Sequence, residues 1–156
     1  MRKVLVFGLV LFLTAPATAQ LRAPGWQKFR IVKTGANVDV PMAIFSKSVG
    51  PPDGGDGRQF ESEDGRAKLT VQSISNSAGD SPARFLAKKH PPANIVYRRV
   101  TPRFFVVSSY RGKSIWYDRC NFAGRLINCI LLKYPAAEKR QWDGIVTRMS
   151  RSLASE

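Results

Sequence analysis

Residues 114–134, SIWYDRCNFAGRLINCILLKY, decide the fold of this chain. Gly124 and Arg125 lie at the centre of the stretch, between two runs of strand-forming residues. A two-residue loop that begins with Gly is typical of a type II′ β-hairpin. Counting outward from this loop pairs Ala123 with Leu126, Phe122 with Ile127, Asn121 with Asn128 and Cys120 with Cys129. The stretch therefore predicts an antiparallel hairpin whose register is set by its turn.

Cys120 and Cys129 are the only cysteines of the chain. The count outward from the turn places them at a non-hydrogen-bonded position, where opposing side chains approach most closely and a disulfide fits. A redox-active pair usually has Cys-x-x-Cys spacing or a group that stabilises a thiolate, and the sequence shows neither. We therefore expect a structural cross-strand disulfide that contributes about 2–3 kcal/mol at most, because the loop it closes is short.

Short turns extend this hairpin into a longer sheet. Four consecutive runs have strand composition: Ile95 to Val100, Phe104 to Ser109, Ser114 to Asn121 and Leu126 to Tyr134. The connections between them are two to four residues long, which is too short for a parallel crossover. The sequence therefore predicts a C-terminal antiparallel meander.

The N-terminal half contains further strand signals. Extended segments are expected at Trp26 to Val32, Val38 to Phe45, Gln59 to Ser62 and Ala67 to Ile74. Asp64-Gly65 lies between the last two and indicates a hairpin turn. Ser46 to Arg58 contains two prolines and four glycines, so it is interpreted as a mobile surface loop.

Two helices are predicted. Ser81-Pro82 is a typical helix start, and the helix should end at His90 because Pro91-Pro92 cannot continue it. A last helix is expected from about Ala137 to Leu153. Its apolar residues fall within an arc of about 100°: Trp142, Ile145, Val146, Met149 and Leu153. The opposite side carries Arg140, Arg148 and Arg151.

These elements place the chain in the α+β class. We expect a mostly antiparallel sheet of about seven or eight strands with two packed helices. The sequence shows no internal repeat and no linker to a second domain, so Gln20 to Glu156 is predicted to form a single domain.

Several stretches also follow one another in a known order. They are Val38 to Pro41 with Phe45, Phe60 to Val71, Phe105 to Ser109, Tyr117, Tyr134-Pro135 and the closing amphipathic helix. Together they resemble a broad group of small exported or peripheral domains with the Mog1/PsbP/DcrB-like fold. The chain departs from that group at Ser109, where a Gly is expected, and in its cysteine pair. The resemblance implies a non-enzymatic accessory or binding module, and it implies no particular ligand or site residues.

The first nineteen residues have the pattern of a signal peptide. Arg2 and Lys3 precede an apolar run from Val4 to Leu13, and an Ala-x-Ala cleavage site ends at Ala19. The alternative is a membrane anchor, but the run is about half of the ~20 residues needed to span a bilayer. We expect cleavage near Ala19, a periplasmic or secreted protein, and no membrane span afterwards.

The net charge of the chain is strongly positive. It is +14, and removal of Arg2 and Lys3 with the signal peptide would leave +12. A charge of this size favours acidic partners such as anionic lipids, acidic glycans or nucleic acid. The alternative is that the charge only keeps an exported protein soluble and monomeric. Nucleic acid is the weaker candidate because no recognition motif is present.

No residues form a recognisable catalytic or metal-binding motif. His90 is the only histidine, and the neighbouring Lys88 and Lys89 disfavour both its protonation and metal binding. Ser108 and Ser109 lack the Gly-x-Ser-x-Gly turn of a nucleophile. The residues 53–57, DGGDG, match neither a calcium loop nor a phosphate-binding loop. No catalytic residue, metal ligand or cofactor is therefore predicted.

Positively charged residues make the strongest candidate for a binding surface. The candidates are Lys88, Lys89, Arg98, Arg99, Arg103, Arg140, Arg148 and Arg151. Interleaved aromatic residues, Tyr97, Phe104, Phe105 and Tyr110, could stack on sugars or bases. The alternative is that the aromatic residues alternate into the core while the cations are simply solvated.

Three functions remain as hypotheses. The first is a non-catalytic periplasmic accessory protein that binds an acidic envelope component through a basic surface. The second is a protein-partner module of an envelope assembly that docks through an apolar patch or a sheet edge. The third is an unrecognised hydrolase, which a pocket grouping Asp118 with Tyr117 or Ser108 would favour.

Overall fold

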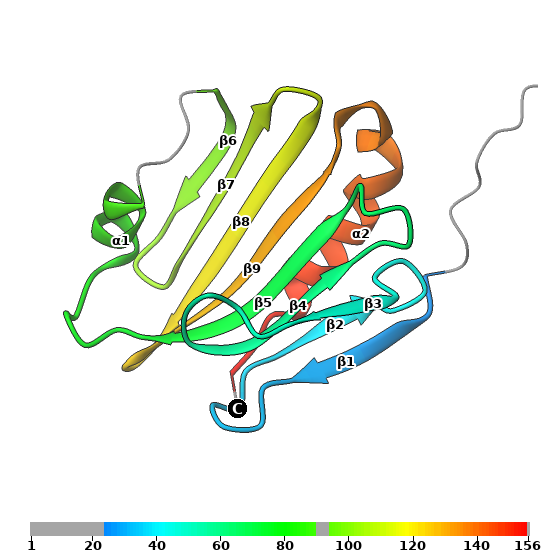
Figure 1. The fold of residues 1–156 in the computed structure, drawn as a ribbon. Helices are drawn as coiled ribbons and strands as arrows, with labels where there is room; N and C mark the ends of the chain where they lie inside the picture. Colours follow the sequence, from blue (N-terminus) through cyan, green and yellow to red (C-terminus); the bar gives the residue numbers. More distant parts are fainter. Residues whose placement is uncertain (1–23, 90–93, 156) are drawn as a thin grey trace, which may run out of the picture.

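The described part of the chain folds into two sheets and two α-helices (Figure 1). A computed structural model describes residues 24–89 and 94–155 of the chain. The strands within these residues are β1 (Trp26–Arg30), β2 (Asn37–Pro41), β3 (Lys47–Gly50), β4 (Asp56–Glu61), β5 (Lys68–Ser75), β6 (Ile95–Val100), β7 (Phe104–Arg111), β8 (Ser114–Ala123) and β9 (Leu126–Pro135). The helices are α1 (Pro82–Lys88) and α2 (Lys139–Ser152), and a 3₁₀ turn (Ala136–Glu138) leads into α2.

All strand pairs are antiparallel. Seven strands form the main sheet in the order β3-β4-β5-β9-β8-β7-β6, and β1 and β2 form a separate hairpin. Strands β6 to β9 are the predicted C-terminal meander, which joins the β3–β5 strands through the β5–β9 pair. The α+β class and the meander are therefore confirmed.

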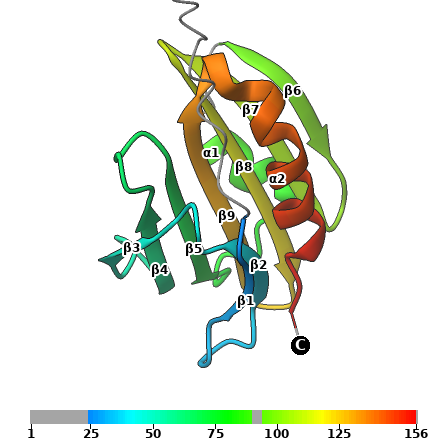
Figure 2. The same ribbon diagram turned by 90° about the vertical axis from the view of Figure 1, so that its right-hand side faces the viewer.

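The main sheet has a different cover on each side (Figure 2). Helix α2 and the β1–β2 hairpin pack on one side, which we call the α2 face. Helix α1 packs on part of the other side, which we call the α1 face. Since successive residues of a strand point to opposite faces, the register of the sheet tells which face each side chain belongs to.

Each face has its own hydrophobic core. On the α2 face the apolar stripe of α2 is buried as its spacing predicts, and Trp142 stacks on Tyr134 with 5.1 Å between ring centroids. On the α1 face Leu86 packs with Phe105 and the disulfide cysteines. Ser81 caps α1 as expected, with its Oγ accepting from the backbone N–H of Arg84.

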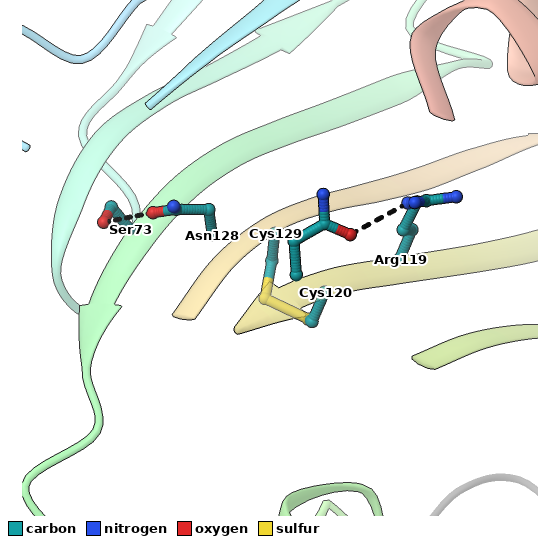
Figure 3. Close-up of a disulfide and its surroundings, with 6 residues drawn as sticks. Ser73, Arg119, Cys120, Asn128 and Cys129 are labelled. Atoms are coloured by element: carbon teal, nitrogen blue, oxygen red, sulfur yellow. Dashed lines mark hydrogen bonds between the residues drawn. A yellow bond between two sulfur atoms is a disulfide. The ribbon is translucent and has the colours of Figure 1, made fainter. Parts of the chain in front are cut away.

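The central hairpin has the predicted register. Ala123 pairs with Leu126, and the count continues without a shift to the pair of Cys120 and Cys129. Gly124 has a φ of +57°, which the first position of the turn requires. The two cysteines form a disulfide with their Cα atoms 4.1 Å apart (Figure 3). This spacing is that of a close, non-hydrogen-bonded pair, as expected.

The glycine-rich segment differs from the expectation. Its residues Lys47–Gly50 form β3, so the main sheet and the β1–β2 hairpin together have one strand more than expected. Gly57 has a φ of +148°, and a Cβ there would lie 2.0 Å from the carbonyl oxygen of Val71. Glycine at this position thus allows β4 to approach β5 closely, whereas the sequence pattern suggested only mobility.

Two element ends also differ. The second predicted strand ends at Pro41, because the backbone N–H groups of Ile44 and Phe45 both donate to its carbonyl oxygen in a turn. Phe45 is nevertheless buried against Trp142. Helix α1 ends at Lys88, and the predicted helix end at His90 lies outside the described residues, as does the predicted signal peptide.

Candidate functional site

The eight candidate cations do not form one surface. Lys88 and Lys89 end α1 on the α1 face, whereas Arg140, Arg148 and Arg151 belong to α2 on the opposite face. Arg98 and Arg99 are consecutive residues of β6 and therefore project to opposite faces. Arg103 lies in the exposed turn between β6 and β7. The sheet thus divides the predicted surface in two.

Two of the candidates already have acidic partners. The Nζ of Lys88 lies 2.6 Å from a carboxylate oxygen of Asp80. The guanidinium of Arg148 bonds to Asp39 at 3.1 Å and lies 4.3 Å from the ring centroid of Trp26. These contacts tie α1 to its preceding loop and α2 to the β1–β2 hairpin. Both cations therefore have structural roles that compete with ligand binding.

The meander holds the uncompensated charge. Its only acid is Asp118, and its cations are Arg98, Arg99, Arg103, Arg111, Lys113, Arg119, Arg125 and Lys133. None of these cations forms an ion pair with a described residue. Outside the meander, every described acidic side chain except Asp53 forms one. The positive field is therefore concentrated on β6 to β9.

Two of these cations are brought together on the α2 face. Arg99 on β6, Val106 on β7 and Arg119 on β8 form one row across three neighbouring strands. The two guanidinium groups both lie against the ring of Phe104, at 5.4 Å and 4.5 Å from its centroid. We call Arg99 and Arg119 the arginine pair.

Arg119 is the more constrained member of the arginine pair. Its Nε donates to Asn121 Oδ1 at 3.0 Å (Figure 3), and its Nη1 donates to Ser150 Oγ at 3.1 Å. Burial lowers the pKa of Arg119, and the like charge of Arg99 also lowers it. A half-buried guanidinium without a carboxylate is costly, so this position favours an anion from outside the described structure.

A groove adjoins the arginine pair between α2 and the outer strands of the meander. Its volume is about 650 Å³. The sheet contributes Val96, Tyr97, Ser108, Tyr110, Tyr117 and Tyr134, and α2 contributes Lys139, Asp143, Val146 and Thr147. All four tyrosines of the chain therefore line this one groove. We call it the tyrosine groove.

The register places the tyrosine groove directly beside the arginine pair. Tyr97, Ser108 and Tyr117 form the row on the α2 face next to the row that holds Arg99 and Arg119. Neighbouring rows on one face are about 7 Å apart, since they are separated by two residues of each strand. A ligand in the groove can therefore reach both guanidinium groups.

The four tyrosines have different environments. Tyr134 is buried in its stack with Trp142, and burial raises its pKa to about 12. The hydroxyl of Tyr117 donates to Ser150 Oγ at 2.7 Å, and burial raises its pKa as well. Tyr97 and Tyr110 are 49% and 36% exposed. The groove thus has a fixed, neutral floor and two accessible rings.

The grouping that would have favoured a hydrolase does not form. Tyr117 and Ser108 lie on the α2 face, and Asp118 lies on the α1 face because it follows Tyr117 in the same strand. Burial raises the pKa of Asp118, which Lys89 and Arg111 partly offset. The sheet separates this carboxyl from both hydroxyl groups, so the three cannot act on one substrate.

The exposed residues of this site are recognisable from the sequence, whereas its half-buried arginine is not. Charge and aromatic pattern indicated Arg99, Tyr97 and Tyr110, but not Arg119, as binding residues. A signal was available, because the disulfide register and the short turn after Arg111 together align Arg119 with Val106 and Arg99. Recognising this alignment requires the register of β6, β7 and β8 together.

Neither a metal site nor a membrane span is apparent in residues 24–89 and 94–155. They contain no group of three or more His, Cys, Asp or Glu side chains placed to hold a metal ion. No helix among them has the length and apolar character needed to cross a membrane.

The comparisons with known proteins identify the fold. No protein-family model and no curated protein sequence matches the chain. Among solved structures, it is similar to the solution structure of cyanobacterial PsbP (CyanoP) from Synechocystis sp. PCC 6803, with a TM-score of 0.60. The match has 9% sequence identity and covers 94% of this chain and 99% of that chain. The fold is therefore PsbP-like, as the sequence resemblance implied.

Proposed function

We propose that this chain is a non-catalytic accessory protein of the cell envelope that binds an acidic component through the meander. The observation that carries the proposal is the concentration of unpaired cations on β6 to β9, with Asp118 as their only acidic neighbour in the meander. The PsbP-like fold is compatible with such a module. An exported location, which the first nineteen residues predict, would place the protein among acidic envelope components.

The electrostatics favour binding over solubility as the reason for the charge. A surface that only needs solubility can mix both signs, as the paired cations and acids elsewhere in this structure do. A segment of one sign instead attracts an oppositely charged partner over about a Debye length, roughly 8 Å at physiological salt. Binding through the meander should therefore be fast and sensitive to salt.

Co-sedimentation of the purified, oxidised protein with cell-envelope fractions tests the proposal. The test variant reverses the charge of Arg98, Arg99 and Arg103, and the control variant reverses Lys28, Arg140 and Arg151, which lie outside the meander. Both variants change the net charge equally. The wild type and the control should pellet at low salt and not at high salt, whereas the test variant should stay in solution.

Other outcomes contradict the proposal in different ways. Equal loss in both variants would show that net charge alone drives pelleting and that the meander is no site. Undiminished pelleting of the test variant would exclude the meander as the binding site. No pelleting of the wild type at either salt would exclude envelope binding.

A protein partner is the second candidate function, because Val96 and Tyr97 expose apolar surface on the outer strand β6. Strand addition at this edge is disfavoured, since the β6–β7 register shifts between Ile95 and Tyr97 in a bulge. The opposite edge has a similar shift between Ser48 and Gly50. Pelleting that survives high salt would favour such a partner over an acidic ligand.

A further inference from the structure

We propose that the tyrosine groove and the arginine pair together bind an acidic oligosaccharide. In this arrangement Arg99 and Arg119 hold a carboxylate of the sugar chain, and Tyr97 and Tyr110 pack against its rings. The inference rests on the proposed function and deepens it, because it names the class of acidic ligand and the place where it binds.

The arginine pair supplies the charge selectivity. Arg99 and Arg119 lie in one row and share the ring of Phe104, which limits how far either guanidinium can move. Two of the donors of Arg119 are used by Asn121 and Ser150, and the two guanidinium groups together have further N–H groups to offer. The planar fork of a guanidinium matches a carboxylate in a bidentate contact.

The accessible tyrosines supply a surface for sugar rings. A tyrosine ring has an apolar face and a hydroxyl group, so it can contact the C–H face of a pyranose and bond to its hydroxyls. Tyr97 and Tyr110 are the exposed pair, and they come from adjacent strands on the same face. Tyr97 lies one row along the sheet from the arginine row and Tyr110 lies two rows from it, so the two rings and the arginine pair could contact successive sugar units.

Apart from the tyrosines, Val96 and Val146, the lining consists of four polar or charged side chains, which favours a hydroxylated ligand over a lipid chain. Ser108 lies on the sheet side of the groove and Thr147 on the α2 side. Lys139 and Asp143 also line the α2 side, where Lys139 Nζ lies 2.8 Å from a carboxylate oxygen of Asp143. An acyl chain would remove these polar and charged groups from water without offering them a hydrogen bond, at a cost in free energy.

An acidic peptide is the competing occupant, and the structure disfavours it. Peptides in grooves beside a sheet edge usually gain main-chain hydrogen bonds from the edge strand. The bulge in β6 between Ile95 and Tyr97 interrupts the regular donor and acceptor pattern there. A sugar chain does not depend on that pattern.

Isothermal titration calorimetry with trigalacturonic acid tests the inference. The matched probe is its trimethyl ester, which keeps the three rings and removes the negative charge. Trigalacturonic acid should bind the wild type and the ester should bind at least ten-fold more weakly. Arg99→Gln and Tyr97→Ala should each weaken binding at least five-fold, whereas Lys28→Gln, outside the groove and the meander, should change it less than two-fold.

Each contrary result has a definite meaning. Equal binding of acid and ester, or binding unaffected by Arg99→Gln and Tyr97→Ala, would overturn the inference. Tighter binding of hexaglutamate than of trigalacturonic acid at the same groove would also overturn it and identify a peptide site. Salt-sensitive envelope pelleting without any binding of trigalacturonic acid would reject the saccharide and leave the proposed function intact.

Discussion

Ser73 and Asn128 face each other across the joint between β5 and β9, where Ser73 Oγ donates to Asn128 Oδ1 at 2.6 Å (Figure 3). Both side chains are buried. Asn128 Nδ2 donates in turn to Ser155 Oγ at 2.5 Å, close to the end of the chain. The β5–β9 pair is the only link within the main sheet, as described, between β3–β5 and the meander. This polar contact therefore favours one register at the joint.

Ser73→Ala should destabilise the protein by about 1–3 kcal/mol, because it leaves the buried Oδ1 of Asn128 without its donor. Ser75→Ala is the matched control, since Ser75 lies on the same strand and face but is exposed. The control should change the free energy of unfolding by less than about 0.5 kcal/mol. Urea unfolding monitored by tryptophan fluorescence measures both. Equal effects would show that the buried hydrogen bond contributes nothing.

Strand alternation and turn chemistry predicted most of this sheet, because both act over a few residues. The faces of Leu69, Val71 and Ser73 and the register of the central hairpin follow from these rules. The strand β3 could not be predicted in this way. Gly57 in the neighbouring strand β4 is explained by the close approach of Val71, a contact between two strands that local sequence does not encode.

The disulfide should stabilise the protein without setting its register. The double variant Cys120→Ala/Cys129→Ala should lose about 2–3 kcal/mol, since the disulfide closes a short loop in the unfolded chain. The turn at Gly124 and the ladder of β8 and β9 remain in the variant. We therefore expect unchanged far-UV circular dichroism and a lower midpoint of urea unfolding.

A reducing agent provides the control for the disulfide. Reductant should lower the unfolding midpoint of the wild type to about that of the double variant, and it should leave the double variant unchanged. A variant with altered circular dichroism would show that the covalent bond, and not the turn, holds the strands in register.

The turn between β4 and β5 should make stability depend on pH in acid. Ser62 Oγ donates to Asp64 Oδ1 at 2.6 Å, and the backbone and guanidinium of Arg66 also donate to this carboxylate. These bonds hold the pKa of Asp64 at about 2, below the usual 3.8. A folded-state pKa below the unfolded value means that the stabilisation is present above about pH 4 and lost as the pH falls to about 2.

Asp64→Asn should therefore reduce the loss of stability between pH 4 and pH 2. Urea unfolding at a series of pH values gives the change of the free energy of unfolding with pH for the wild type and the variant. Asp53→Asn removes an exposed carboxylate with no hydrogen bond or ion pair to a described residue, so its slope should equal that of the wild type. Identical slopes for wild type and Asp64→Asn would contradict the assignment.

The candidate site was less predictable from the sequence than the fold. Exposed cations are visible as charges, but their availability depends on partners far away in the chain. Arg148 appeared to be solvated and instead bonds to Asp39, which precedes it by 109 residues. Arg119 appeared to be an ordinary strand residue and instead lies beside Arg99. Pairings of this kind depend on the tertiary arrangement of α2 and the sheet.

We expect Arg119 to contribute to ligand binding and to contribute little to the stability of the fold. Arg119→Met keeps a long apolar side chain against Phe104 and removes a half-buried charge that has no carboxylate among the described residues. Ser150 Oγ still accepts from Tyr117, and Asn121 Oδ1, which loses its donor, belongs to a partly exposed residue that water can reach. The free energy of unfolding should therefore change by less than about 1 kcal/mol in either direction.

The same variant should lose most of its salt-sensitive envelope pelleting, because it removes half of the arginine pair. Arg125→Met is the control, since it removes one charge from the turn of the central hairpin and leaves the pair intact. It should keep most of the pelleting of the wild type. A loss of more than about 2 kcal/mol in Arg119→Met would instead show that Arg119 is a structural residue, because a loss of that size is typical of breaking a buried network. Undiminished pelleting of a stable Arg119→Met would remove the arginine pair from the binding site.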